Sequence, residues 1–125
     1  VLAMLGLLST NGRASGSVRF DGRDLLGLDE RALRDVRGAR IGLVFQDPMT
    51  ALAPHLTVGT QVVETIRAHA DLDRAVAKAR ALEALRRVRV PDPEARLRQY
   101  PHELSGGLRQ RVMIAIALAA GPALL

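Results

Sequence analysis

Ser105, Gly106 and Gly107 are the residues of this sequence best suited to hold a phosphate group. They precede an apolar run that predicts a helix, and the first turn of a helix presents unpaired N–H groups at the positive end of its dipole. Two glycines leave the backbone open to an anion, and the serine hydroxyl can donate to a phosphate oxygen or cap the helix. Taken alone, the triplet is weak evidence for a phosphate site and is more typical of an ordinary capped turn, so both interpretations stay open at this point.

The composition gives little support to other kinds of reactive site. The 125 residues include no cysteine, which excludes disulfides, thiolate metal sites and thiol nucleophiles. The spacing of the three histidines, without any cysteine, predicts no metal site. Lys78 is the only lysine and follows Ala77 inside a predicted helix, so no Gly-x-x-x-x-Gly-Lys-Ser/Thr phosphate loop is present.

The charge balance favours acidic partners in general. Eighteen basic residues against thirteen acidic ones give a formal charge of +5, which suits nucleic acid, nucleotide phosphates or an anionic membrane surface. The arginines are spread along the chain rather than grouped, so a solvated surface is the preferred interpretation of them. No apolar stretch is long enough to cross a bilayer, and aromatic residues, at 2%, are too few to stack on nucleic-acid bases.

Turn and capping signals predict the elements that would position these residues. Asp21-Gly22 predicts a two-residue hairpin turn after a strand at residues 17–20, with Leu25-Leu26 beginning the return strand. Four helices are expected, each introduced by a capping residue: residues 30–37 after Asp29, 58–69 after Thr57, 74–89 after Asp73, and an apolar helix that starts at the Ser105 triplet and runs to Ala120.

Two apolar runs predict buried strands of a parallel sheet, at residues 41–45 and from residue 123 onward. In the helix over residues 74–89, apolar residues at every third position predict one buried stripe, Val76, Ala79, Leu82, Leu85 and Val88, with Arg74, Lys78, Arg86 and Arg87 on a solvated face. Both chain ends are apolar, whereas domain termini are usually polar, so we expect the sequence to be the middle of a longer polypeptide.

Three segments are similar, in order and spacing, to motifs of one protein family. Residues 100–115, YPHELSGGLRQRVMIA, resemble the signature motif of ATP-binding-cassette (ABC) ATPases, in particular those of dipeptide, oligopeptide and nickel importers. Residues 44–54, VFQDPMTALAP, are similar to the Q-loop of that subfamily and the residues after it, and residues 20–26, FDGRDLL, match its N-terminal hairpin. The resemblance extends over essentially the whole chain.

The resemblance implies an α/β fold, a partial P-loop NTPase with an antiparallel β segment, part of a parallel core sheet and a helical subdomain. Residues 1–56 would hold the helix tail after Walker A, the β-hairpin and the Q-loop. Residues 57–103 would form the helical subdomain that docks on the membrane-spanning subunits. Residues 104–125 would supply the signature motif, its helix and the start of the Walker B strand.

The resemblance also implies roles for particular residues. Gln46 would be the catalytic Q-loop glutamine, which in this family reaches the Mg²⁺ ion and the attacking water and senses the transporter subunit. Ser105, Gly106 and Gly107 would contact the γ-phosphate of ATP held by the opposite protomer of a head-to-tail dimer. ATP and Mg²⁺ are therefore the implied cofactors. Leu108 replaces the family's usual glutamine or methionine, so its side chain offers no polar contact to nucleotide.

The implied function is that of an ATP-binding subunit that couples ATP hydrolysis to the import of peptides or nickel, from the cytoplasmic face of the inner membrane as a peripheral protein. Implied partners are the transmembrane permease subunits, a second ATPase subunit in a homo- or heterodimer and, indirectly, an extracytoplasmic solute-binding protein, but not nucleic acid. The chain contains no Walker A loop, and no Asp or Glu follows Glu103 to serve as Walker B. These 125 residues alone should therefore not hydrolyse ATP.

Two other functions stay open. A non-transport ATPase of the same family, acting on nucleic acid or ribosomes, would account for the basic charge, although the residues after Gln46 and before Ser105 are more typical of importers. A catalytically inactive docking module, which keeps the helical subdomain only for binding, is the other alternative.

Overall fold

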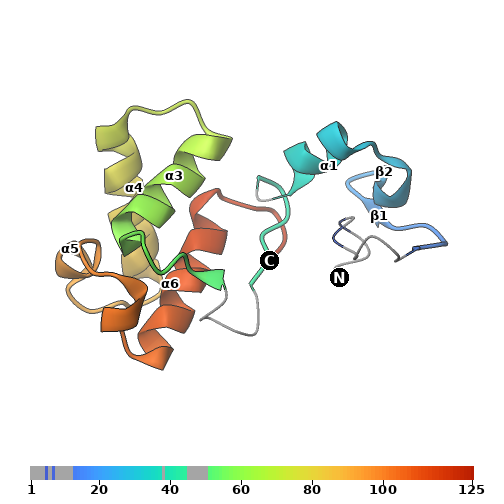
Figure 1. Cartoon of the computed structure of the whole chain (residues 1–125). Helices are drawn as coiled ribbons and strands as arrows, with labels where there is room; N and C mark the ends of the chain where they lie inside the picture. The colour runs from blue at the N-terminus through green and yellow to red at the C-terminus, as the bar shows by residue number, and fades with distance from the viewer. Residues whose placement is uncertain (1–4, 6, 8–12, 38, 45–50) are drawn as a thin grey trace. The chain divides into compact units, whose positions relative to one another are not determined.

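A computed structural model of the chain describes residues 5, 7, 13–37, 39–44 and 51–125. The chain divides into two compact units, Val1–Arg37 and Gly38–Leu125. Among its described residues the first contains a small hairpin, a 3₁₀ turn and the helix α1, and the second contains the remaining helices (Figure 1).

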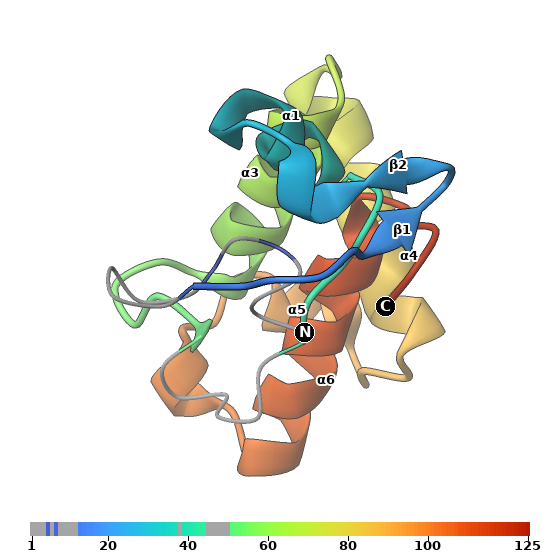
Figure 2. The ribbon, with the colours of Figure 1, turned by 90° about the vertical axis from the view of Figure 1, so that its right-hand side faces the viewer.

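The hairpin of the first unit forms at the predicted turn. Strands β1 (Arg19–Phe20) and β2 (Arg23–Asp24) pair antiparallel and are joined by two residues (Figure 2). Asp21 and Gly22 both have positive φ, at 51° and 79°. Two residues of positive φ are what a type I′ turn requires, and Asp-Gly is a favoured pair for it. The predicted hairpin turn is thus confirmed.

The prediction that Leu25-Leu26 begin the return strand is wrong. The return strand is β2, and residues Leu25–Gly27 form a 3₁₀ turn, η2. The carboxylate of Asp24 causes the change, because its Oδ1 accepts hydrogen bonds from the backbone N–H groups of Leu26 and Val18, each at 3.1 Å. This side chain caps the turn at the point where the ladder would otherwise continue.

Helix α1 (Glu30–Val36) begins where its capping signal predicts. The Asp29 carboxylate accepts from an N–H of the first turn at 2.7 Å. At the other end, Arg37 donates from Nε to the carbonyl of Leu5 at 2.7 Å and forms an ion pair with Glu30 at 2.6 Å. Arg37 therefore connects the end of α1 to the beginning of the chain.

The second unit is built from three helices, α3 (Val58–His69), α4 (Arg74–Arg87) and α6 (Gly106–Ala119), which pack on one another. The short helices α5 (Pro93–Arg96) and η3 (Pro101–Glu103) connect α4 to α6 (Figure 1). Their shared core is aliphatic, and its most buried members are Val58, Val62, Ile66, Ala77, Ala81, Leu85, Val112 and Ala115. One core therefore includes the helix that starts at the Ser105 triplet.

The predicted apolar stripe of α4 is only partly correct. Val76 is 46% exposed and Ala79 is also exposed, whereas Ala77, Ala81 and Ala84 are buried in the core. An α-helix repeats every 3.6 residues, so a row of residues three apart winds around the helix and leaves the buried face. The buried residues follow the i, i+4, i+7 spacing of a face directed at the core.

The two predicted apolar runs meet in parallel, as expected for a core sheet. Ile41 and Leu124 form an isolated parallel bridge, and Gly42 donates from N–H to the Leu124 carbonyl at 2.8 Å. A Cβ atom at Gly42 would lie 2.9 Å from the carbonyl oxygen of Ala117, so glycine lets this segment lie directly against α6. Among the described residues the pairing is one bridge rather than two full strands, and residue 45 of the predicted strand lies outside them.

Candidate functional site

The Ser105 triplet begins helix α6, as its sequence predicts. Ser105 has extended backbone angles and is the N-cap residue. Its Oγ accepts a hydrogen bond from the N–H of Leu108 at 3.4 Å, and its carbonyl accepts from the N–H of Arg109 at 2.9 Å. Because the hydroxyl oxygen acts as the acceptor toward Leu108, the hydroxyl hydrogen stays available for donation to another group.

The backbone of Gly106 and Gly107 is open to an approaching group. Both residues are exposed, and a Cβ atom built on either would meet no other atom within 4 Å. Within the part of the chain that the structure describes, their N–H groups have no hydrogen-bond acceptor. The first turn of α6 contains no acidic residue. Two free N–H groups, a hydroxyl and a positive helix end fit the chemistry of a phosphate group.

The residues that precede the triplet hold it in place. The carboxylate of Glu103 accepts a hydrogen bond from the backbone N–H of Tyr100, three residues earlier in the chain, at 2.6 Å. Arg109 donates from Nε to the Pro101 carbonyl at 2.8 Å and thereby links the first turn of α6 to η3. The rings of Tyr100 and His102 stack with centroids 5.6 Å apart. These contacts fix the approach to Ser105 without covering it.

Gln46, the other predicted site residue, lies outside the described residues. Its catalytic and metal-contacting roles therefore stay predictions.

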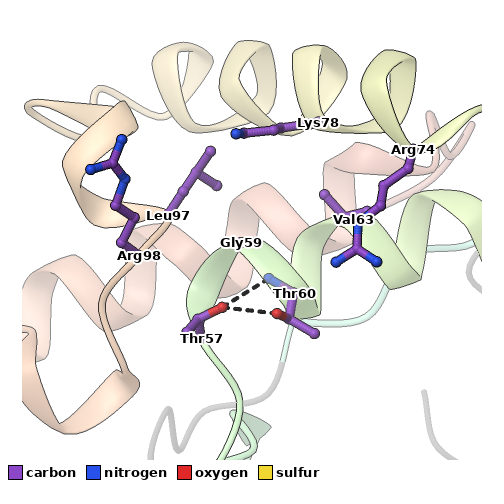
Figure 3. A pocket seen from close by; sticks show the side chains of 8 residues that line it. All are labelled: Thr57, Gly59, Thr60, Val63, Arg74, Lys78, Leu97 and Arg98. Carbon is purple, nitrogen blue, oxygen red and sulfur yellow. Dashed lines mark hydrogen bonds between the residues drawn. The ribbon is translucent and has the colours of Figure 1, made fainter.

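The structure adds a second candidate region that the sequence analysis missed. Arg74 and Lys78 of α4, which were predicted to lie on a solvated face, border a hollow of about 360 Å³ together with Arg98 (Figure 3). Its remaining lining consists of Thr57, Gly59, Thr60, Val63 and Leu97, and it contains no acidic residue. Within the described residues, the side chains of the three cations make no hydrogen bond or ion pair with the rest of the chain.

The hollow combines positive charge at its border with an apolar floor. Val63 and Leu97 are buried there, and the hydroxyls of Thr57 and Thr60 lie 2.9 Å apart and bond to each other. Arg98 comes from the segment after α5, so no spacing in the sequence relates it to Lys78. The hollow can therefore be recognised only in the folded chain, where that segment packs against α3.

The described residues offer neither a membrane span nor a metal site. They include no helix that combines the length and the apolarity needed to span a membrane. They also include no group of three or more histidine, aspartate and glutamate side chains placed to hold a metal ion.

Comparison with known protein families gives a clear result. The family model described as ABC transporter matches residues 2–125 of this sequence. The chain belongs to the ABC transporter family. Its Ser105 triplet therefore lies in the segment that resembles the signature motif of this family, at the start of α6.

Individual family members are similar to this chain over almost its whole length. A probable peptide ABC transporter ATP-binding protein of Sinorhizobium fredii is 55% identical over 99% of the chain. The oligopeptide transport ATP-binding protein OppD of Salmonella typhimurium is 47% identical over 98%, and the dipeptide transport ATP-binding protein DppD of Haemophilus influenzae is 48% identical over 99%. The chain spans 38%, 37% and 38% of these three relatives, respectively.

Solved structures of ABC cassettes share this fold. The dimeric structure of MJ0796, a bacterial ABC transporter cassette, superposes with a TM-score of 0.76 at 33% identity, over 86% of this chain and 46% of that one. A post-hydrolysis state of the same cassette bound to ADP and Pi gives a TM-score of 0.77 over the same shares. The chain thus has part of the α/β fold of an ABC ATPase, a P-loop NTPase, as the resemblance implied.

Proposed function

We propose that this chain is part of the ATP-binding subunit of an ABC importer that couples ATP hydrolysis to the uptake of peptides. The supporting observation is identity of 47–55% over nearly the whole chain to proteins named for peptide, oligopeptide and dipeptide transport. These names favour peptides over nickel as the solute. The subunit would work as a peripheral protein on the cytoplasmic face of the inner membrane, and an extracytoplasmic solute-binding protein would deliver the peptide to its permease.

In this proposal the start of α6 binds nucleotide held by a second ATPase subunit. The N–H groups of Gly106 and Gly107 and the hydroxyl of Ser105 would donate to the γ-phosphate of ATP, which their exposure and open surroundings support. Gln46 would contact Mg²⁺ through its amide oxygen and orient the attacking water. Bound Mg²⁺ would supply positive charge that neutralises the phosphate oxygens.

A substitution at Ser105 tests this role in the full-length subunit assembled with its partners. Ser105→Arg places a bulky side chain where the phosphate would bind, so ATP hydrolysis should fall by about 100-fold, the scale of losing oxyanion donors. Ser15→Arg makes the same chemical change at an exposed residue of the first unit and should leave hydrolysis within about twofold of wild type. Equal rates for both variants would refute the role of Ser105.

The 125-residue chain by itself should show no ATP turnover above that of its own Ser105→Arg variant. It holds neither the Walker A lysine nor the Walker B carboxylates. Turnover that depends on Ser105 in the isolated chain would contradict this expectation.

The helical subdomain, proposed to span residues 57–103, would dock on the transmembrane permease subunits. The hollow bordered by Arg74, Lys78 and Arg98 supports a contact with an acidic segment, because three cations lie above an apolar floor without any acidic neighbour in the lining. A carboxylate would pair with the cations at the border, and an aliphatic side chain beside it would cover the apolar floor. An inorganic anion would leave the floor uncovered.

Charge reversal tests this docking surface. Lys78→Glu should lower the fraction of subunit that copurifies with the permease by about tenfold, and added salt should weaken the wild-type complex in the same way. Arg80→Glu makes the same kind of charge change on the same helix, at an exposed residue that does not line the hollow. Equal losses for Lys78→Glu and Arg80→Glu would show that overall charge, rather than the hollow, governs assembly.

A further inference from the structure

The side chain of Gln61 in α3 holds the loop that precedes its own helix. Its Oε1 accepts from the backbone N–H of Ala53 at 2.9 Å. Its Nε2 donates to the carbonyl of Ala53 and to the carbonyl of Leu56, each at 3.0 Å. One N–H and two carbonyls surround this amide, so only one orientation of its oxygen and nitrogen satisfies all three bonds.

The loop over residues 52–57 is attached at both ends, to the helical core and to α3. Leu52 is 3% exposed and belongs to the helical core, which fixes the beginning of the loop. The N–H of Leu56 donates to the Ala53 carbonyl at 3.3 Å and closes a turn. Thr57 caps α3 and fixes the end of the loop. The three bonds of Gln61 attach the middle of this loop to α3 as well.

The loop held by Gln61 connects two regions with proposed functions. Residue 53 follows Gln46 by seven positions, so the loop held by Gln61 continues directly from the segment that resembles the Q-loop. At its other end, Thr57 and Thr60 line the hollow bordered by Arg74, Lys78 and Arg98. A displacement of residue 51 would therefore reach the hollow only if residues 52–56 do not absorb it.

We infer that Gln61 is a positioning residue that makes residues 53–56 move together with α3. The inference rests on the proposed function, because Gln46 and the hollow take their roles from it. Gln61 itself contacts neither nucleotide nor permease in this account. Its three hydrogen bonds remove the rotational freedom of residues 53–56, so a change at the nucleotide is passed to the permease contact instead of being lost in the loop.

Two substitutions separate the hydrogen bonds from the packing of this side chain. Gln61→Met keeps a similar length and removes all three bonds. Gln61→Glu keeps the acceptor for the Ala53 N–H but loses both donors and faces two carbonyls with a carboxylate. Gln99→Glu is the matched control. Among the described residues the side chain of Gln99 serves as an acceptor alone, from Arg96 Nη1 at 2.8 Å, and a glutamate keeps that bond.

Hydrogen exchange in the full-length subunit tests the clamp directly. In Gln61→Met the amide of Ala53 should exchange about tenfold faster or more, since it loses its acceptor, while the capped amide of Ala32 keeps its rate. Gln99→Glu should leave both amides unchanged. An Ala53 amide that exchanges at the wild-type rate in Gln61→Met would overturn the inference, and this readout does not depend on ATP hydrolysis or transport.

Coupling is measured in the transporter reconstituted with its permease in liposomes, as trialanine taken up per ATP hydrolysed. In Gln61→Met this ratio should fall about fivefold or more, while kcat and KM for ATP stay within about twofold of wild type. Uptake and hydrolysis that fall together, at an unchanged ratio, would show a merely structural residue and overturn the inference. A wild-type transporter that neither hydrolyses ATP nor takes up trialanine would refute the proposed function instead, and the exchange of Ala53 would still decide whether Gln61 holds the loop.

Discussion

Gly59 offers a sharp test of how closely the helices of the second unit pack. It lies in the first turn of α3, donates from its N–H to the carbonyl of Leu97 at 2.8 Å, and forms part of the floor between α3 and the segment after α5. A Cβ atom at this position would lie 2.7 Å from the Leu97 oxygen and 3.2 Å from the Leu97 Cβ. Gly59→Ala therefore adds one methyl group where no space exists.

The expected change in the free energy of unfolding on Gly59→Ala combines three effects. To reach an ordinary contact of 3.4 Å the Leu97 oxygen must move by about 0.7 Å, and overpacking of this kind costs about 1–3 kcal/mol. The same movement stretches the hydrogen bond between the two residues, which is worth about 1 kcal/mol. Alanine has a higher helix propensity than glycine, which stabilises α3 by about 1 kcal/mol. Gly59→Ala should therefore lower the free energy of unfolding by about 1–3 kcal/mol.

Gly107→Ala is the matched control, because Gly107 is also in the first turn of a core helix and its Cβ would meet no atom within 4 Å. It should raise the free energy of unfolding by about 0.5 kcal/mol through helix propensity alone. Urea denaturation followed by far-ultraviolet circular dichroism measures both, as shifts of the midpoint at constant slope. A Gly59→Ala variant that is as stable as wild type would refute the close approach of Leu97 to α3.

Three further predictions concern the stability of the second unit, measured by thermal or urea unfolding. Arg111 donates from Nη1 to the carbonyls of Arg89 and Val88 at the end of α4. Arg111→Met should therefore lower the free energy of unfolding by about 0.5–1 kcal/mol, and an unchanged value would mean that water replaces these bonds. Arg89 has a positive φ of 58°, a left-handed conformation that glycine adopts without strain. Arg89→Gly should therefore raise the free energy of unfolding by about 0.5–1 kcal/mol, and a lower value would contradict the left-handed conformation. Ile66 is fully buried, so Ile66→Val should lower the free energy of unfolding by about 0.5–1.5 kcal/mol. An unchanged free energy of unfolding would place Ile66 outside the core.

The parts of the fold that were predicted correctly depend on local chemistry. Asp29 and Thr57 cap α1 and α3 through bonds to residues three positions away, so the sequence contains both partners of each bond. The Asp21-Gly22 turn is equally local, since two residues with positive φ define it. Asp24 shows the limit of this reasoning, because its carboxylate stops the strand that the pattern of apolar residues would have continued.

The parts that were missed depend on residues distant in the sequence. The buried face of α4 is selected by contacts with α3 and α6, and a count of every third residue does not reproduce it. The hollow needs Arg98 beside α4, which only the fold brings about. At the candidate site the helix start at Ser105 was predictable from the triplet itself, whereas the amide of Gln61 could be connected to Ala53 only in three dimensions.

The stacked pair of Tyr100 and His102 gives this chain a built-in spectroscopic reporter. The sequence has one tyrosine and no tryptophan, so its near-ultraviolet absorption and intrinsic fluorescence arise almost entirely from a ring five positions before Ser105. Because that ring lies against the imidazole of His102, a rearrangement of the segment leading into α6 changes the emission of a single known residue. Events at the start of α6 can therefore be followed in the unlabelled chain, with Tyr100→Phe as the blank.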